Sequence, residues 1–285
     1  MSRRAGVEAI RTRGWLAAHK WLLIRRASQL MVFALFWSGP LLGLWIARGN
    51  LASSTLFGVI PLSDPFIQLQ SWVAGHPLAQ DALLGTSLVT LFYMLVGGRL
   101  FCSWVCPLNV VSDFAGWSRR RLGLRGGWRP KRHTRYLVLL MVLGLALGTG
   151  QLAWELVNPV SMVQRGLIFG FGFAWMAVAA LFLWELLVSP QGWCGRLCPH
   201  GALFSLLGRW APLRIHTPTR EKCDDCMDCY QVCPEPQVIK PALKGGDATV
   251  PRIGEINCTN CGRCIDVCPQ SIFTFGIKIK PSETS

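Results

Sequence analysis

The sequence predicts a membrane all-α body of four transmembrane helices, arranged as two duplicated helix pairs, followed by a small C-terminal α+β domain. Three observations predict this class. Four long apolar stretches lie in the first two thirds of the chain, and a similar short cysteine motif follows the second stretch of each pair. In addition, eight of the 12 cysteines lie after residue 222, in two copies of one spacing.

Each apolar stretch is close to the ~20 residues that a helix needs to cross ~30 Å of hydrocarbon. The stretches cover residues 27–47, 82–101, 136–157 and 167–188. Basic residues concentrate before the first stretch, between the second and third, and after the fourth. This distribution predicts a multi-pass protein of the bacterial inner (cytoplasmic) membrane with both termini in the cytoplasm.

These boundaries divide the chain into three parts. We expect a basic cytoplasmic N-terminal segment over residues 1–26, a four-helix transmembrane domain over 27–212, and a cytoplasmic domain over 213–285. The formal net charge is +14, and a protein this basic usually binds nucleic acid. Because 51% of the residues are hydrophobic and the positive charge lies in loops around apolar segments, nucleic acid is excluded as a partner.

The strongest motif is C-x2-C-x2-C-x3-C-P, which occurs from Cys223 to Pro234 and again from Cys258 to Pro269. In bacterial ferredoxins this spacing binds [4Fe–4S] clusters, and the fourth cysteine of each motif binds the other cluster. We therefore predict two clusters, both bound as metal sites by cysteine. The first is assigned to Cys223, Cys226, Cys229 and Cys268, and the second to Cys258, Cys261, Cys264 and Cys233.

Zinc is the alternative, because paired C-x2-C units often bind it. A tetrahedral zinc site does not explain the third cysteine of each motif, the proline after the fourth, or the repetition of the whole spacing. The C-terminal domain is therefore predicted to be a double-cubane, ferredoxin-like domain.

The remaining cysteines form a second repeated motif, Cys102-Ser-Trp-Val-Cys106-Pro107 and Cys194-Gly-Arg-Leu-Cys198-Pro199. If the two halves pair, Cys102, Cys106, Cys194 and Cys198 form a group of four thiols. Such a group suits a third metal centre or a dithiol relay, whereas the plain alternative is that buried cysteines pack as small hydrophobic residues. We expect a redox or metal role for these four residues, with its type left open.

Weaker candidates are acids in or beside the apolar stretches, where ionisable groups are costly and often functional: Asp64, Glu155 and Glu185. The histidines His76, His133 and His200 lie at loops or stretch ends. None of them forms the facing pair that a b-type haem requires, so no haem is predicted.

The combination of four spans, two Cys-x3-Cys-Pro motifs and the double ferredoxin motif resembles the NapH family over essentially the whole chain. The similarity includes Leu-Phe-Cys102-Ser-Trp-Val-Cys106-Pro-Leu-Asn, Gly-Trp-Cys194-Gly-Arg-Leu-Cys198-Pro and Cys229-Tyr-Gln-Val-Cys233-Pro-Glu-Pro. The resemblance implies an electron-transfer subunit of a quinol dehydrogenase. It also implies a periplasmic ferredoxin-type partner, NapG, with a multihaem cytochrome and a periplasmic nitrate reductase receiving electrons from the quinone pool.

The related MauN proteins of methylamine utilisation share this architecture and lead to an alternative. In that case the chain is an accessory redox protein that supplies electrons for the assembly of a periplasmic enzyme, and quinol is not turned over.

Overall fold

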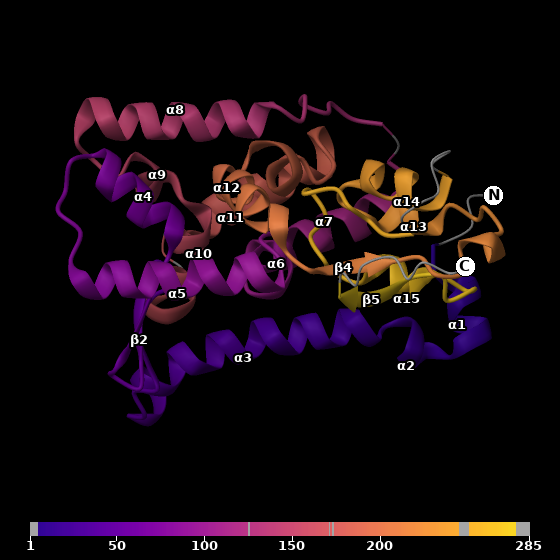
Figure 1. Cartoon of the computed structure of the whole chain (residues 1–285), viewed down its shortest axis with the longest axis horizontal. Helices are drawn as coiled ribbons and strands as arrows, with labels where there is room; N and C mark the ends of the chain where they lie inside the picture. Colours follow the sequence, from indigo (N-terminus) through magenta and orange to yellow (C-terminus); the bar gives the residue numbers. More distant parts are fainter. Residues whose placement is uncertain (1–4, 125, 171, 173, 245–250, 278–285) are drawn as a thin grey trace, which may run out of the picture. The chain divides into compact units, whose positions relative to one another are not determined.

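The computed structural model describes residues 5–124, 126–170, 172, 174–244 and 251–277 (Figure 1). The chain forms two compact units, each assembled from separate stretches. The first unit contains Met1–Ser28, Tyr93–Trp104 and Ser205–Ser285, and the second contains Gln29–Phe92 and Val105–Phe204. The two ends of the chain therefore belong to the same unit. Residues 1–4, at the start of the predicted basic segment, lie outside the described residues.

The first unit is built from short helices and one small sheet. Its helices are α1 (Val7–Arg13), α2 (Trp15–Ala18), α6 (Leu100–Trp104), η3 (Gly208–Trp210), η4 (Arg220–Lys222), α13 (Asp228–Val232), η5 (Pro236–Val238), α14 (Lys240–Lys244) and α15 (Arg263–Val267). Three longer helices, α3 (Lys20–Leu42), α5 (Gln80–Val96) and α12 (Pro199–Leu207), each have one end in this unit and the other end in the second.

The sheet of the first unit joins two segments that are distant in sequence. Strand β4 (Leu213–His216) pairs antiparallel with β5 (Thr274–Ile277), which Figure 1 shows beside it. The hydrophobic core next to this sheet includes Ile215, Ile239 and Phe273, all fully buried, together with several cysteine side chains. Because the core of this small unit is partly made of cysteine, its folding and the state of its thiols are physically linked.

The N-terminal segment is part of the first unit through the carboxylate of Asp266. This carboxylate accepts hydrogen bonds from the backbone N–H groups of Trp21 (3.0 Å) and Leu22 (2.9 Å), in the first turn of α3. The first N–H groups of a helix have no partner within the helix, and a side-chain oxygen stabilises them. The side chain of Arg13 also donates to the carbonyl of Ile265 (3.1 Å). A residue near the C-terminus thus fixes the start of the first long helix.

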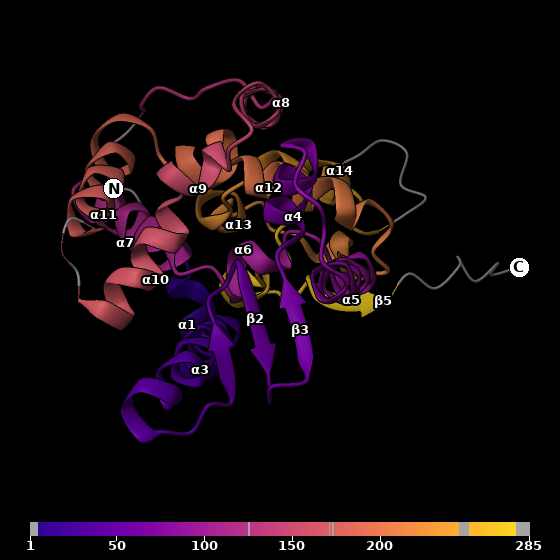
Figure 2. The ribbon, with the colours of Figure 1, turned by 90° about the vertical axis from the view of Figure 1, so that its left-hand side faces the viewer.

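The second unit contains a three-stranded antiparallel sheet, ordered β1 (Ala47–Gly49), β2 (Ser53–Leu56) and β3 (Ile60–Ser63); Figure 2 shows two of these strands, β2 and β3, side by side. Its helices are α4 (Pro65–Val73), α7 (Leu108–Arg121), α8 (Thr134–Thr149), α9 (Ala153–Val157), α10 (Pro159–Phe169), α11 (Ala174–Leu183) and the π-helices η1 (Trp184–Val188) and η2 (Trp193–Leu197). Phe66, Leu139 and Trp154 form part of its core.

Two equivalent turns in the second unit match the repeat in the sequence. Asp64 accepts from the N–H of Phe66 (2.7 Å) at the start of α4, and Asn158 accepts from the N–H of Val160 (3.0 Å) at the start of α10. In both cases proline occupies the first helical position, where its missing N–H costs nothing. The two halves of the unit therefore begin their helices in the same way.

The apolar stretches do not form the helices expected of them. Among the described residues, no helix is both long enough and apolar enough to cross a membrane. This finding contradicts the predicted four-helix transmembrane body, with its spans at 27–47, 82–101, 136–157 and 167–188, and it contradicts the predicted multi-pass inner-membrane location with cytoplasmic termini.

Glycine and basic side chains account for the difference. Helix α5 ends at Val96 because Gly97 has φ 143°, and α8 ends where Gly150 adopts the left-handed conformation. Gly170, with φ 98°, separates α10 from α11. Helix α3 is 23 residues long, but it starts at Lys20 and continues through Arg25 and Arg26.

Candidate metal centres

Four cysteines from both ferredoxin-type motifs surround one pocket in the first unit. We call this group the first cysteine site; it consists of Cys223, Cys226, Cys229 and Cys268. Cys229 lies in α13, whereas Cys268 follows the last residue of α15. Apolar side chains, including Ile272 and Phe273, complete the wall. One cysteine of the second motif thus lies with three cysteines of the first.

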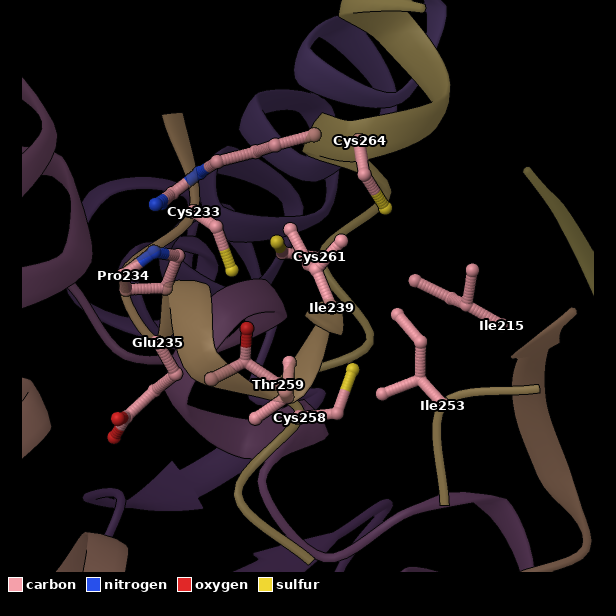
Figure 3. A pocket seen from close by; sticks show the side chains of 12 residues that line it. Ile215, Cys233, Pro234, Glu235, Ile239, Ile253, Cys258, Thr259, Cys261 and Cys264 are labelled. Carbon is pink, nitrogen blue, oxygen red and sulfur yellow. The ribbon is translucent and has the colours of Figure 1, made fainter. Parts of the chain in front are cut away.

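The reciprocal group surrounds another pocket. This second cysteine site consists of Cys233, Cys258, Cys261 and Cys264, and Figure 3 shows their sulfur atoms pointing into the pocket. Ile215, Ile239 and Ile253 line the same space. The two sites contain the two sets of four cysteines that the spacing assigned to separate clusters. Their role as ligands stays a prediction.

The backbone explains why each motif wraps around a pocket. In the first motif Asp225 and Met227 have φ values of 56° and 62°, and in the second motif Asn260 and Gly262 have 46° and 72°. These left-handed residues occupy equivalent positions and turn the loop before the short helix begins. In each motif the short helix follows this loop, and the fourth cysteine comes directly after the helix, next to the other pocket.

The two sites differ in exposure and in the charges near them. Cys226 of the first site is exposed, whereas Cys261 and Cys264 of the second are buried. Burial, the carboxylates of Asp224 and Asp228, and a side-chain hydrogen bond to Asp224 raise the pKa of Cys226, whereas a backbone hydrogen bond lowers it.

At the second site burial also disfavours the thiolate. The positive charges of Arg263 and Arg25, together with hydrogen bonds, outweigh that effect, so the pKa of Cys261 lies below its usual value. Burial nevertheless raises the pKa values of Cys233, Cys258 and Cys264 at the same site. Aspartates act on Cys223 and Cys226 of the first site, whereas arginines act on thiols of the second.

The donor sets suit iron–sulfur clusters. Each pocket offers four thiols, which is the complete protein ligand set of a [4Fe–4S] cube. Within the described part of the chain, no group of three histidine, cysteine, aspartate or glutamate side chains is arranged to hold a metal ion. Four thiols around a common pocket fit a [4Fe–4S] cube in their chemistry.

The Cys-x3-Cys-Pro cysteines are divided between the units. Cys102 lies in α6 of the first unit, whereas Cys106, Cys194 and Cys198 belong to the second. Burial raises the pKa of Cys194 well above its usual value, and the nearby Glu185, Cys106 and Cys198 raise it further. Three of the four predicted thiols are thus close enough within one unit to interact electrostatically.

Glu185 is the most unusual acid in this region. Its side chain is fully buried in η1, and Oε1 accepts from the N–H of Trp193 (3.1 Å). Burial raises its pKa to about 7, and the charge of Asp113 acts in the same direction. The hydroxyl of Ser112, on α7, lies 3.4 Å from the Cys194 sulfur. A carboxyl group that titrates near neutrality therefore lies beside a cysteine of the repeated motif.

Another buried pair joins Asp64, one of the weaker candidates from the sequence, to His200. The Nε2 atom of His200 lies 2.9 Å from the Asp64 carboxylate, and both side chains are buried in the second unit. No motif indicates this pairing, since 136 positions separate the two residues. Nor does any motif indicate the arginines around the second cysteine site, because their positions depend on the fold.

Comparisons with known sequences cover both kinds of motif. The model of a 4Fe-4S binding domain family matches residues 78–125 and 171–218, and the model of a 4Fe-4S dicluster domain family matches residues 222–272. The first family thus matches twice, once around each Cys-x3-Cys-Pro motif, and the second includes all eight cysteines of the two sites. No solved structure matches the chain.

Curated relatives match almost the full length. The chain is 46% identical over 272 residues to the ferredoxin-type protein NapH of Escherichia coli, which covers 95% of this chain and 94% of that protein. It is 51% identical over 269 residues to the methylamine utilization ferredoxin-type protein MauN of Paracoccus denitrificans, covering 94% of each. The MauN protein of Methylorubrum extorquens is 49% identical over 269 residues, covering 94% and 93%.

Proposed function

This chain belongs to the NapH/MauN family of ferredoxin-type iron–sulfur electron-transfer proteins, and we propose that it passes electrons from quinol toward a periplasmic nitrate reductase. In this role it is the iron–sulfur subunit of a quinol dehydrogenase. The observation that carries the proposal is the pair of four-cysteine pockets in the first unit.

Two [4Fe–4S] clusters are the cofactors in this proposal. Cys223, Cys226, Cys229 and Cys268 bind the first cluster, and Cys258, Cys261, Cys264 and Cys233 bind the second. When bound, each cluster accepts and releases one electron. The protein side chains exclude water from the second site, since isoleucines from β4 and from the η5–α14 region line it, and they leave an edge of the first site exposed at Cys226.

We further propose a redox or metal role for Cys102, Cys106, Cys194 and Cys198. Two observations support it. The 4Fe-4S binding domain family matches around both motifs, and Cys194 lies beside the buried carboxyl group of Glu185. Oxidation of quinol releases protons as well as electrons, and a carboxyl group with a pKa of about 7 suits the uptake of a proton at neutral pH.

The partners follow from the proposed role. They are a NapG-type periplasmic ferredoxin subunit, a multihaem cytochrome and the nitrate reductase downstream. Support comes from the 46% identity to a protein named NapH.

A MauN-like accessory function is the second candidate, and the relatives supply the observation in its favour. The identity to MauN of Paracoccus denitrificans, 51%, exceeds the 46% identity to NapH of Escherichia coli. In this case the same two cluster sites supply electrons for the assembly of a periplasmic enzyme, and quinol is not a substrate.

Anaerobic reconstitution followed by reduction tests both candidates. We expect about eight iron and eight sulfide per chain, from two four-iron clusters. Addition of duroquinol should then produce the EPR signal of reduced clusters. Protein that binds no iron or sulfide overturns the cluster assignment. Protein that binds both, and is reduced by dithionite but not by duroquinol, overturns the quinol proposal and supports the accessory function.

A further inference from the structure

The second cysteine site is surrounded by buried arginines that come from four separate parts of the first unit. Arg25 and Arg263 act electrostatically on Cys261, whereas Arg99 and Arg214 act on Cys258. All four side chains are at most 9% exposed. Buried charges are costly and are normally compensated by a neighbour. Of the four, Arg263 lines the pocket of the second cysteine site.

These arginines are held in place in different ways. Arg99 forms a salt bridge of 2.9 Å with Glu235, and both side chains are 1% exposed, so their charges largely cancel. Arg214 instead donates to the backbone carbonyls of Gly208 (2.6 Å), Ala211 (3.2 Å) and Glu255 (3.3 Å). Carbonyl groups fix the guanidinium group and leave its net charge intact. Arg214 therefore contributes a full positive charge beside Cys258.

The first cysteine site has the opposite surroundings. Asp224 and Asp225 act on Cys223, and Asp224 and Asp228 act on Cys226. The carboxylate of Asp228 accepts from the backbone N–H of Gly6 (2.8 Å), which holds it in place without cancelling its charge. A site that gains an electron becomes more negative, so nearby aspartates disfavour reduction and nearby arginines favour it.

We propose that the buried arginines give a cluster at the second cysteine site a higher reduction potential than a cluster at the first. An electron that enters at the first site then moves to the second. This inference rests on the proposed binding of two clusters, but it does not depend on which molecule donates the electron.

Burial alone acts in the opposite direction, because a dry surrounding disfavours additional negative charge at the second site. The arginines oppose this effect: at Cys261 their charges, together with hydrogen bonds, outweigh burial, whereas at Cys258 burial still raises the pKa to about 11. The Coulomb interaction grows as the effective dielectric constant falls, so charges buried beside the pocket act more strongly than exposed ones. The aspartates of the first site lie near the exposed Cys226, where water weakens their influence but also makes the site accessible to an electron donor.

A redox titration of the reconstituted full chain, followed by EPR with dithionite and mediators, tests the order of the potentials. Cys223→Ala removes a ligand of the first site only, so the remaining signal belongs to the second. Cys258→Ala identifies the first in the same way. We expect the reduction potential of the second site, measured in Cys223→Ala, to be higher than that of the first site, measured in Cys258→Ala. Equal potentials, or the reverse order, overturn the proposal.

Charge variants test the cause. Arg214→Gln should lower the second-site potential and leave the first-site potential unchanged. Arg214→Lys, which keeps the charge, should have the second-site potential of the wild type. Arg209→Gln is the matched control, because Arg209 is an exposed arginine in the same segment, beside Trp210. If Arg214→Gln prevents cluster loading, Arg263→Gln provides the same measurement. Unchanged second-site potentials in variants that load both clusters overturn the proposal, even if quinol reduces the protein.

Discussion

The two ferredoxin-type motifs place their cysteines with loops of their own, whereas the surroundings of Cys194 come from distant parts of the chain. Each ferredoxin-type loop turns on two left-handed residues and ends in a short helix. Cys194, in contrast, lies beside Ser112 of α7 and within electrostatic range of Glu185 in η1. Both patterns are duplicated in the sequence. The difference teaches that a short loop can place its own cysteines, whereas the surroundings of Cys194 depend on the packing of distant segments.

Removal of one cysteine from each pattern tests this difference most directly. Cys264→Ala should lose about half of the iron, because one of two four-iron clusters loses a ligand. Cys194→Ala should retain the iron of both sites. Iron and sulfide analysis after anaerobic reconstitution measures both. Loss of iron in Cys194→Ala as well would show that the Cys-x3-Cys-Pro motif also binds a metal, in favour of a third centre over a dithiol relay.

The buried carboxyl group of Glu185 should make stability depend on pH. Burial raises its pKa from 4.5 to about 7, so the folded protein binds this proton more tightly than the unfolded chain does. Its stabilising contribution is therefore present below pH 4.5 and is lost as the pH rises through about 7. The loss is on the order of 3 kcal/mol for the full shift.

Urea unfolding at several pH values measures this contribution. Glu185→Gln cannot ionise, so it should lose less stability than wild type across this range. Glu221→Gln, at an exposed position, serves as the control. If the stability of the wild type and of Glu185→Gln depended on pH in the same way, the raised pKa of Glu185 would be contradicted.

Equivalent loop positions within the ferredoxin-type motifs offer a finer comparison. Gly262 has φ 72°, and a Cβ atom there would lie 2.7 Å from the Cβ and Cγ atoms of Trp21. Gly262→Ala should therefore destabilise the first unit by about 1–3 kcal/mol. At the equivalent position Met227 has φ 62° and is exposed, so Met227→Gly should stabilise the protein by up to about 1 kcal/mol. Chemical denaturation measures both, and a change of the same sign in the two variants would refute the argument.

The smallest effect concerns the repeated helix starts of the second unit. Asp64→Asn keeps an oxygen for the N–H of Phe66, as Asn158 does for Val160, whereas Asp64→Ala removes it. We expect Asp64→Ala to cost about 1 kcal/mol more than Asp64→Asn, which is the usual value of such a cap. Thermal unfolding of the two variants measures the difference. Equal stabilities would mean that the cap contributes nothing and that Asp64 acts through His200 alone.

The apolar stretches show where interpretation of the sequence failed. Length and composition predicted four helices across a membrane, but glycines with positive φ end or divide three of the corresponding helices. Among the described residues the structure has no helix that could make such a crossing. A hydropathy pattern does not report backbone conformation, and glycine is the residue that adopts these conformations most readily.

The sequence by itself determined the family and predicted the division of eight cysteines into two groups of four, because the motif spacing is that of bacterial ferredoxins, in which the fourth cysteine crosses to the other group. Only the tertiary structure decided the charges around each group. Arg25, Arg99 and Arg214 reach the second site from three separate segments, and Glu185 becomes a titratable group near neutral pH only when the fold buries it. Electrostatic effects depend on distance and dielectric surroundings, and neither is encoded in local spacing.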